Sequence, residues 1–135
     1  LWYAWMLAAR ARHAEALREI RLVRSIEPLD PLIAVRVGTI RYLAGDIEGA
    51  VDECRRVAAQ NPDFALAHRQ LGEAMVQQPG QAQAGVAALR RAAALWPTTE
   101  TRARLAYGLA RAGADAEARR VLAALERGVA DAYVS

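Results

Sequence analysis

Few side chains in this 135-residue chain are suited to catalysis or metal binding. The chain holds one cysteine, Cys54, and two histidines, His13 and His68, at no spacing that metal ligands use. A single cysteine also excludes an internal disulfide. No glycine-rich phosphate loop, nucleophile elbow or H-E-x-x-H pattern is present. The sequence therefore predicts a protein that is not an enzyme and that uses no metal and no cofactor.

The elements that would position these residues repeat along the chain. Prolines that close helical stretches lie at Pro28, Pro62 and Pro97, which are 34 and 35 residues apart. Three further columns repeat with steps of 34, 35 and 33 residues. They hold a turn residue (Ala11, Gly45, Gly80, Gly113), a small residue (Ala16, Ala50, Gly85, Ala118) and an apolar residue (Ile20, Cys54, Leu89, Leu122). The sequence therefore predicts a helical repeat.

Each repeat is expected to form two antiparallel helices, because its apolar residues recur at helical spacing. Side chains that could cap helix N-termini are Asp30, Asp46, Asp63 and Thr98 or Thr99. Glycine at the turns suits a positive φ. One extra residue within 77–79 includes a proline, so the first helix of the third unit should end at or before Gln78 and a longer loop should follow.

We predict one all-α domain, 1–135, of about four helix pairs. The units are expected at 1–30, 31–64, 65–99 and 100–132, with the start of a fifth at 133–135. Small residues where helices cross would let neighbouring helices approach to roughly 8–10 Å. These residues are Gly38, Ala50, Gly72, Gly85 and Ala118.

The columns resemble the tetratricopeptide repeat (TPR), whose unit has the pattern W-x2-L-G-x2-Y, then A-x3-F, then P. The second unit has Val37-Gly38 at the L-G place, Ala50 and Cys54 at the A-x3-F places and Pro62 at the close. The resemblance implies a right-handed α-solenoid. More narrowly, the phrases NPDFALAH, ARAGADAEARRVL and AYVS are similar to the C-terminal repeat arrays of large bacterial multidomain regulators.

Repeat position decides what we expect of the three candidate residues. Cys54 takes the phenylalanine place, where a buried thiol has a raised pKa and is inert. His68 takes the tryptophan place and should pack between the two helices of its unit. His13 should lie exposed in the turn of the first unit. All three are therefore interpreted as structural residues.

The resemblance implies that partners bind in the concave groove lined by the first helices of the units. The side chains expected to face this groove are Trp5, Arg36, Thr39, Tyr42, Arg69, Gln70, Glu73, Gln77, Arg104, Tyr107 and Arg111. Arginine and tyrosine together suit hydrogen bonds to carboxylates and contact with an extended peptide. We therefore expect a non-catalytic scaffold for a protein or peptide, with an acidic partner favoured. A soluble but unused groove is the alternative.

A second set of arginines is expected on the convex face, where it would form a ladder. The set consists of Arg21, Arg55, Arg56, Arg90 and Arg91. Asp52 precedes Arg55 and Arg56, and Glu117 precedes Arg120, at the spacing of solvated helical ion pairs. Nucleic acid stays an alternative partner because the net charge is +3, although the arginines alternate with acids. Structural support for an upstream DNA-binding, kinase or cyclase domain is a further alternative.

Some TPR arrays clamp a chaperone's terminal carboxylate with Lys and Asn, but Val35 and Thr39 take those places in the second unit, and Arg69 and Glu73 in the third. A chaperone tail held in that way is not expected. The opening LWYAWMLAA is too short to cross a bilayer and lacks the basic start of a signal peptide. Since the first residue is Leu, we expect a piece of a longer protein. A cytoplasmic location is favoured, and an extracytoplasmic one stays open.

Overall fold

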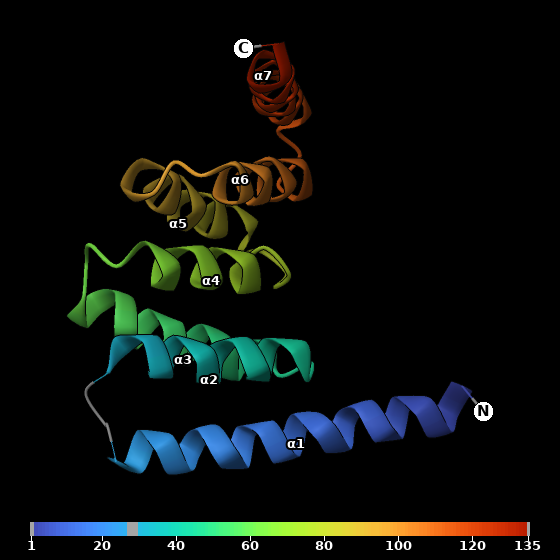
Figure 1. Cartoon of the computed structure of the whole chain (residues 1–135), viewed down its shortest axis with the longest axis vertical. Helices are drawn as coiled ribbons and strands as arrows, with labels where there is room; N and C mark the ends of the chain where they lie inside the picture. Colours follow the sequence, from blue (N-terminus) through green and yellow to red (C-terminus); the bar gives the residue numbers. More distant parts are fainter. Residues whose placement is uncertain (1, 27–29, 135) are drawn as a thin grey trace.

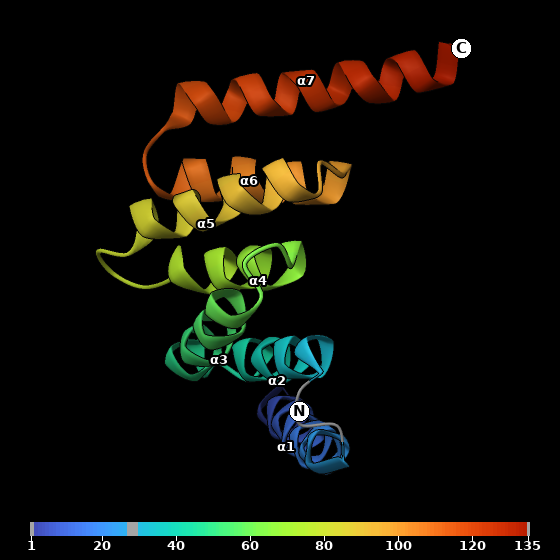
Figure 2. The ribbon, with the colours of Figure 1, turned by 90° about the vertical axis from the view of Figure 1, so that its left-hand side faces the viewer.

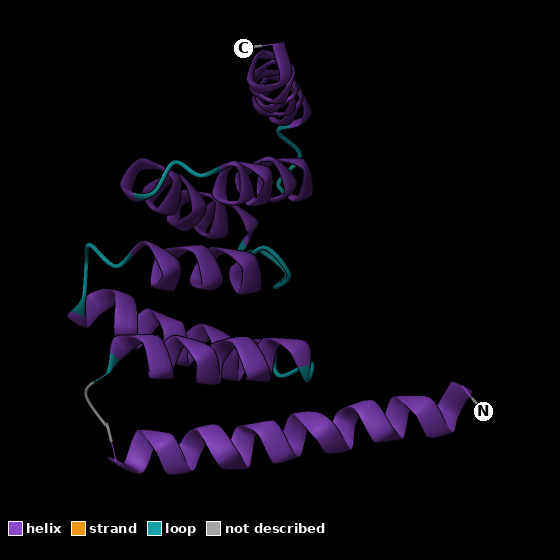
Figure 3. Ribbon diagram, viewed as in Figure 1, coloured by secondary structure: helices purple, strands orange, loops and turns teal. Residues whose placement is uncertain are grey.

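The computed structural model describes residues 2–26 and 30–134, and the side chains of 12–26 and 30–128. Every regular element in the described residues is an α-helix (Figures 1 and 3). The helices are α1 (Trp2–Ile26), α2 (Pro31–Leu43), α3 (Ile47–Gln60), α4 (Ala65–Met75), α5 (Ala82–Leu95), α6 (Thr99–Arg111) and α7 (Asp115–Val134). The all-α prediction is confirmed.

The helices stack as successive hairpins. Helix α2 packs against α3, α4 against α5 and α6 against α7, and each hairpin contacts the next (Figure 2). The first helices α2, α4 and α6 also contact one another in a row. Helix α1 lies at one end of the stack, against α2, and α7 lies at the other end (Figure 1). This is the arrangement of a helical repeat, in which each unit is stabilised by its neighbours.

Three of the predicted caps are confirmed. The side chains of Asp30, Asp46 and Thr98 accept hydrogen bonds from first-turn backbone amides at 2.9, 2.9 and 3.1 Å. The prediction for Asp63 is wrong, because α4 begins without a side-chain cap. The carboxylate of Asp63 instead lies 3.3 Å from the guanidinium of Arg91 on α5.

The turns within the hairpins depend on glycine at positive φ, as predicted. The residues are Gly45, Gly80 and Gly113, with φ of 90°, 76° and 84°. Two turns are short, at 44–46 and 112–114, whereas residues 76–81 form the longer loop expected around the inserted proline. The described part of the chain has no non-glycine residue at positive φ.

The turn predicted at Ala11 is wrong. Helix α1 runs without a break through this position. Alanine is the best helix former and, unlike glycine, strongly resists positive φ, so nothing at this place ends the helix. The first unit, 1–30, is therefore one long helix rather than a pair, and His13 lies half-buried within α1 rather than in an exposed turn.

The predicted boundary after residue 132 is also wrong. Helix α7 continues to Val134, so 133 and 134 do not begin a fifth unit, and Ser135 lies outside the described residues. The position that holds a closing proline in the earlier units is Ala130. Because alanine keeps its amide hydrogen and fits a helix, α7 passes through this position.

The predicted small residues lie in the seams between helices. All five are buried: Gly38, Ala50, Gly72, Gly85 and Ala118. A Cβ on Gly72 would lie 2.7 Å from the carbonyl oxygen of Gly85, and a Cβ on Gly85 would lie 3.0 Å from that of Gly72. Helices α4 and α5 therefore cross backbone to backbone, at a distance that only glycine allows.

We expect Gly72→Ala to lower the free energy of unfolding by about 1–3 kcal/mol, because the new methyl group meets backbone atoms that cannot move aside. Urea denaturation followed by circular dichroism measures the change. The matched control is Gly128→Ala on α7, where an added Cβ meets nothing within 4 Å. That substitution should stabilise the protein by about 0.5–1 kcal/mol. If the Gly72→Ala protein were as stable as the Gly128→Ala protein, the close crossing would be contradicted.

We expect Asp46→Ala to destabilise the protein by about 1 kcal/mol at neutral pH, whereas Asp63→Ala should have little effect because Asp63 caps no helix. The hydrogen bond from the amide of Gly49, followed by the interactions with Arg41, lowers the pKa of Asp46. The stabilisation is thus present above the ordinary carboxyl pKa and lost as the pH falls through the lowered one. Thermal unfolding at neutral and acidic pH should show the difference between wild type and Asp46→Ala shrinking in acid.

Candidate functional site

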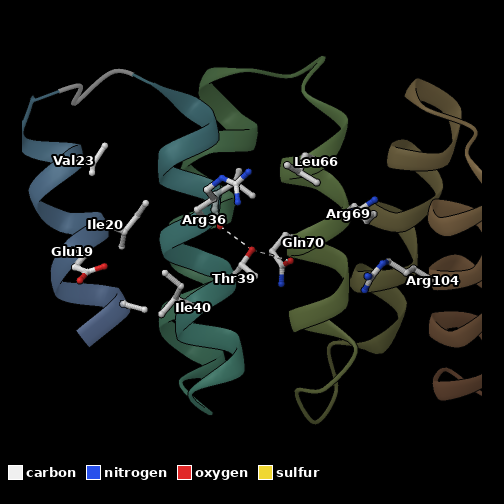
Figure 4. A pocket seen from close by; sticks show the side chains of 12 residues that line it. Glu19, Ile20, Val23, Arg36, Thr39, Ile40, Leu66, Arg69, Gln70 and Arg104 are labelled. Atoms are coloured by element: carbon white, nitrogen blue, oxygen red, sulfur yellow. Dashed lines mark hydrogen bonds between the residues drawn. The ribbon is translucent and has the colours of Figure 1, made fainter. Parts of the chain in front are cut away.

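A cavity of about 620 Å³ opens along the row of first helices (Figure 4). Helices α1, α2 and α4 form its walls, and a side chain from α6 reaches its edge. Five of the residues predicted to face the groove line it: Arg36, Thr39, Arg69, Gln70 and Arg104. Apolar side chains of α1, α2 and α4 complete the lining, among them Ile20, Ile40 and Leu66. We call this cavity the α1–α4 pocket.

A second hollow of about 370 Å³ continues the groove toward α6. Its lining includes four predicted residues: Tyr42, Glu73, Arg104 and Tyr107. Arg104 lines both hollows, so the two form one run along the row of first helices. Gln77 lies at this end and donates a hydrogen bond to the hydroxyl of Tyr107 at 3.0 Å. Eight of the eleven predicted residues thus line the two hollows, and this hydrogen bond holds a ninth, Gln77, beside Tyr107.

Two predicted residues are not among those that line the two hollows. Arg111 is the last residue of α6 and lines neither hollow. Trp5 belongs to α1, but its side chain lies outside the described residues. Arg111 is exposed one turn beyond Tyr107, at the end of the helix, and its place in the groove stays a prediction.

Acidic side chains already neutralise part of the groove. Arg104 forms ion pairs with Glu73 and with Glu100, the latter at 2.9 Å. The guanidinium of Arg69 lies 3.7 Å from the other oxygen of Glu100 and 5.8 Å from the ring centre of Trp96. Sequence reasoning missed Glu100 and Trp96, although the i,i+4 spacing of Glu100 and Arg104 is a helical ion-pair signal.

The arginines of the groove are close enough to affect one another. Burial, followed by the charge of Arg69, lowers the pKa of Arg104. An arginine stays protonated despite such a shift, so the lowered pKa reports two cations held near each other in a partly desolvated site. An anionic group placed between them would be attracted to both.

Several buried donors in the groove have no acceptor within the described residues. They are the Nε atoms of Arg69 and Arg104 and the amide nitrogen of Gln70. The other end of the Gln70 amide is held by the hydroxyl of Thr39 at 3.2 Å, and Gln70 is 7% exposed. Donors buried without an acceptor are costly, so a ligand or water that supplies oxygen atoms would stabilise this site.

Two of the residues considered for catalysis have contacts that suit a structural role. Cys54 is fully buried, and burial, with a smaller contribution from Glu53, raises the pKa of its thiol to about 12. The thiol is thus protonated at neutral pH, as predicted. His68 places Nε2 2.7 Å from the carbonyl oxygen of Pro62 and so ties α4 to the loop before it. Within the described residues no group of three or more His, Cys, Asp or Glu side chains could hold a metal ion.

Several arginines of the predicted convex ladder form ion pairs within the fold. Arg90 donates to both carboxylate oxygens of Glu117 at 2.6 and 2.8 Å, which raises the pKa of Arg90 and lowers that of Glu117. Arg56 bonds Glu53 at 2.5 Å, and Arg91 pairs with Asp63. The pairing expected between Glu117 and Arg120 is replaced by this bond across helices, because a two-pronged contact is the stronger one.

The expected pairing of Asp52 with the arginines that follow it is likewise absent from the described ion pairs. Arg56 turns instead to Glu53, which also receives Arg24 of α1 at 2.6 Å. Three of the five ladder arginines therefore have their charge matched within the fold.

No helix in the described part of the chain is long and apolar enough to span a membrane.

Comparison with known proteins identifies the fold. No family model matches the chain, and no curated protein matches it. Among solved structures, MamA 41-end from Desulfovibrio magneticus RS-1 superposes with a TM-score of 0.73 at 20% identity, over 90% of this chain and 68% of that one. MamA AMB-1 gives a TM-score of 0.69 at 18% identity, over 85% and 70%. The chain therefore has the all-α, TPR-like helical-repeat fold of these structures.

Proposed function

We propose that the protein is a non-catalytic scaffold that docks a segment of a partner protein in the groove along α2, α4 and α6. The observation that carries this proposal is the α1–α4 pocket, a cavity of about 620 Å³ lined by residues from four helices. A concave, partly apolar cavity with a few convergent polar groups is the usual form of a binding site. Grooves of stacked helix pairs are used in this way in repeat proteins.

The chemistry of the pocket favours an extended peptide that carries a carboxylate. Among the residues whose side chains are described, its charged lining consists of Arg36, Arg69 and Arg104 against one acid, Glu19. Arg36 is exposed and takes part in no ion pair among the described residues. Guanidinium groups recognise carboxylates through paired hydrogen bonds, and the unpartnered N–H groups would donate hydrogen bonds to backbone carbonyl oxygens of the same peptide.

The acids of the second hollow limit this preference. Glu73 and Glu100 hold Arg104, and Glu100 also lies near Arg69, so the α6 end of the groove is close to neutral. The peptide would therefore place its carboxylate toward Arg36 and its aromatic or apolar groups toward Tyr42 and Tyr107. The narrower resemblance to repeat arrays of bacterial regulators supports a place for this scaffold within a larger regulatory protein, where it would serve signalling by association.

The test uses a short fluorescent peptide that alternates Glu and Leu, with a Lys and Leu peptide as its opposite. Fluorescence anisotropy should show that Arg36→Gln combined with Arg69→Gln weakens binding of the Glu peptide about tenfold or more, because each lost charge-assisted hydrogen bond costs more than a neutral one. The Lys peptide should bind more weakly than the Glu peptide to the wild type.

The matched control is Arg55→Gln combined with Arg119→Gln. Both residues are exposed, neither lines the groove, and the net charge changes by the same amount. Equal weakening by the two double variants would show that only overall charge attracts the peptide and would contradict groove binding. Loss of binding to nucleic acid in the control variant, with a steep salt dependence, would instead support the nucleic-acid alternative.

A further inference from the structure

The face of α1 that borders the α1–α4 pocket corresponds to a face that is buried in the core on α3 and α5. Ala16, Ile20 and Val23 line the pocket. In the repeat register they match Ala50, Cys54 and Val57 of α3, and Gly85, Leu89 and Ala92 of α5. All six of the matching residues are buried, whereas Val23 is 44% exposed and Ala16 and Ile20 are half-buried. Helix α1 therefore presents a core stripe that is only partly covered.

The structure shows which helix covers this stripe elsewhere. Leu89 lies between two glycines, Gly72 of its own hairpin and Gly108 of the next, each close enough that a Cβ would lie within 2.6 Å of the leucine side chain. For Ile20 of α1, the residue that corresponds to Gly108 is Ile40 of α2, and both isoleucines line the pocket. The residue that corresponds to Gly72 is residue 4, which belongs to α1 itself. Since about 24 Å of straight helix separates residues 4 and 20, they cannot meet within one chain.

Residues 2–9 nevertheless retain the sequence of a first helix. Tyr3-Ala4 stands in the columns of Val37-Gly38, Leu71-Gly72 and Leu105-Ala106, with a bulky apolar residue followed by a small one. The absence of a turn at Ala11 separates this segment from the face it matches. The N-terminal end of α1 instead projects past the end of α2, away from the stack (Figure 1).

We propose that two copies of this chain pair through α1 by exchanging this segment, so that residues 2–9 of each copy fill the α1 side of the other's pocket. In the second unit Gly38 faces Cys54, with a Cβ on Gly38 only 2.5 Å from Sγ. The same offset in α1 places Ala4 of one copy against Ile20 of the other. Two antiparallel α1 helices in this register are related by a two-fold axis beside Arg12, and the same contact forms twice.

A second copy fits this face better than the other occupants do. Each copy carries both the segment and the matching stripe, in the register that the hairpins of the same chain already use. The chain's own segment could reach the stripe only through a turn at Ala11, where alanine resists the positive φ that the three glycine turns adopt.

Disulfide trapping tests the register. An Ala4→Cys chain and an Ile20→Cys chain, each of the full 135 residues and of distinguishable mass, are mixed and oxidised with glutathione. The control mixture pairs Ala4→Cys with Leu22→Cys, since Leu22 is 67% exposed and lies off the stripe. We expect at least about tenfold more mixed disulfide than in the control, because the exchange brings the two sulfur atoms within bonding reach. Equal yields would overturn the proposal.

Wild-type protein controls for Cys54, whose buried thiol should form no cross-link. A chain that carries both Ala4→Cys and Ile20→Cys separates the possible states. The exchange gives a covalent dimer, whereas a folded-back segment gives a cross-linked monomer and overturns the proposal. Free thiols in this double variant, with circular dichroism of a folded protein, would also overturn it.

A second measurement uses a substitution at Ala11, the position at which the other units have a glycine turn. Ala11→Gly supplies the turn residue that the other hairpins have, so each copy can close on itself, and we expect the dimer seen by sedimentation equilibrium to weaken roughly thirtyfold. Ala14→Gly is the matched control, because residue 14 is helical in both the open and the closed form and its effect cancels. A wild type that stays monomeric at high concentration, or equal effects of the two glycines, would contradict the exchange.

Discussion

The whole stack depends on how closely its helices approach at their crossings. Gly72 and Gly85 bring α4 and α5 together backbone to backbone, and Gly108 brings α6 against the same Leu89 side chain. Because the chain has so few aromatic side chains, its core is made of small and branched aliphatic residues packed at short range. A side chain added at a crossing would separate the units and change the curvature of the groove that α2, α4 and α6 line.

The repeat period predicted most of the fold because it reports which residues share an environment. It located the glycine turns, the seams and the longer loop at 76–81. It did not predict that the helices continue through Ala11 and Ala130. These residues align with the turn glycines and the closing prolines of the other units, but alanine does not break a helix. A period describes tertiary environments, whereas the end of a helix is decided locally by glycine, proline and caps. Where the two disagree, the local chemistry decides.

The groove shows the same division between what a sequence predicts and what it does not. Helix periodicity predicted eight of the side chains that line it, since side chains that share a helix face share a surface. It did not predict that Glu100 would hold both Arg104 and Arg69, because contacts between helices depend on their separation and crossing angle. The consequence is chemical: the α6 end of the groove is nearly neutral and Arg36 carries the less compensated charge. Specificity would then depend on where along the groove a carboxylate lies.

The long α1 helix and the open pocket have one cause. A glycine at residue 11 would allow a turn, and the folded segment would cover Ile20 and Val23 and narrow the pocket on its α1 side. With alanine there, the helix stays straight, the stripe stays partly exposed and the pocket remains wide. A surface that would be core in a complete hairpin cannot be neutral toward association, because apolar area left in water favours any contact that covers it. In the exchange proposed above, one missing turn would thus couple the width of the groove to the association state of the chain.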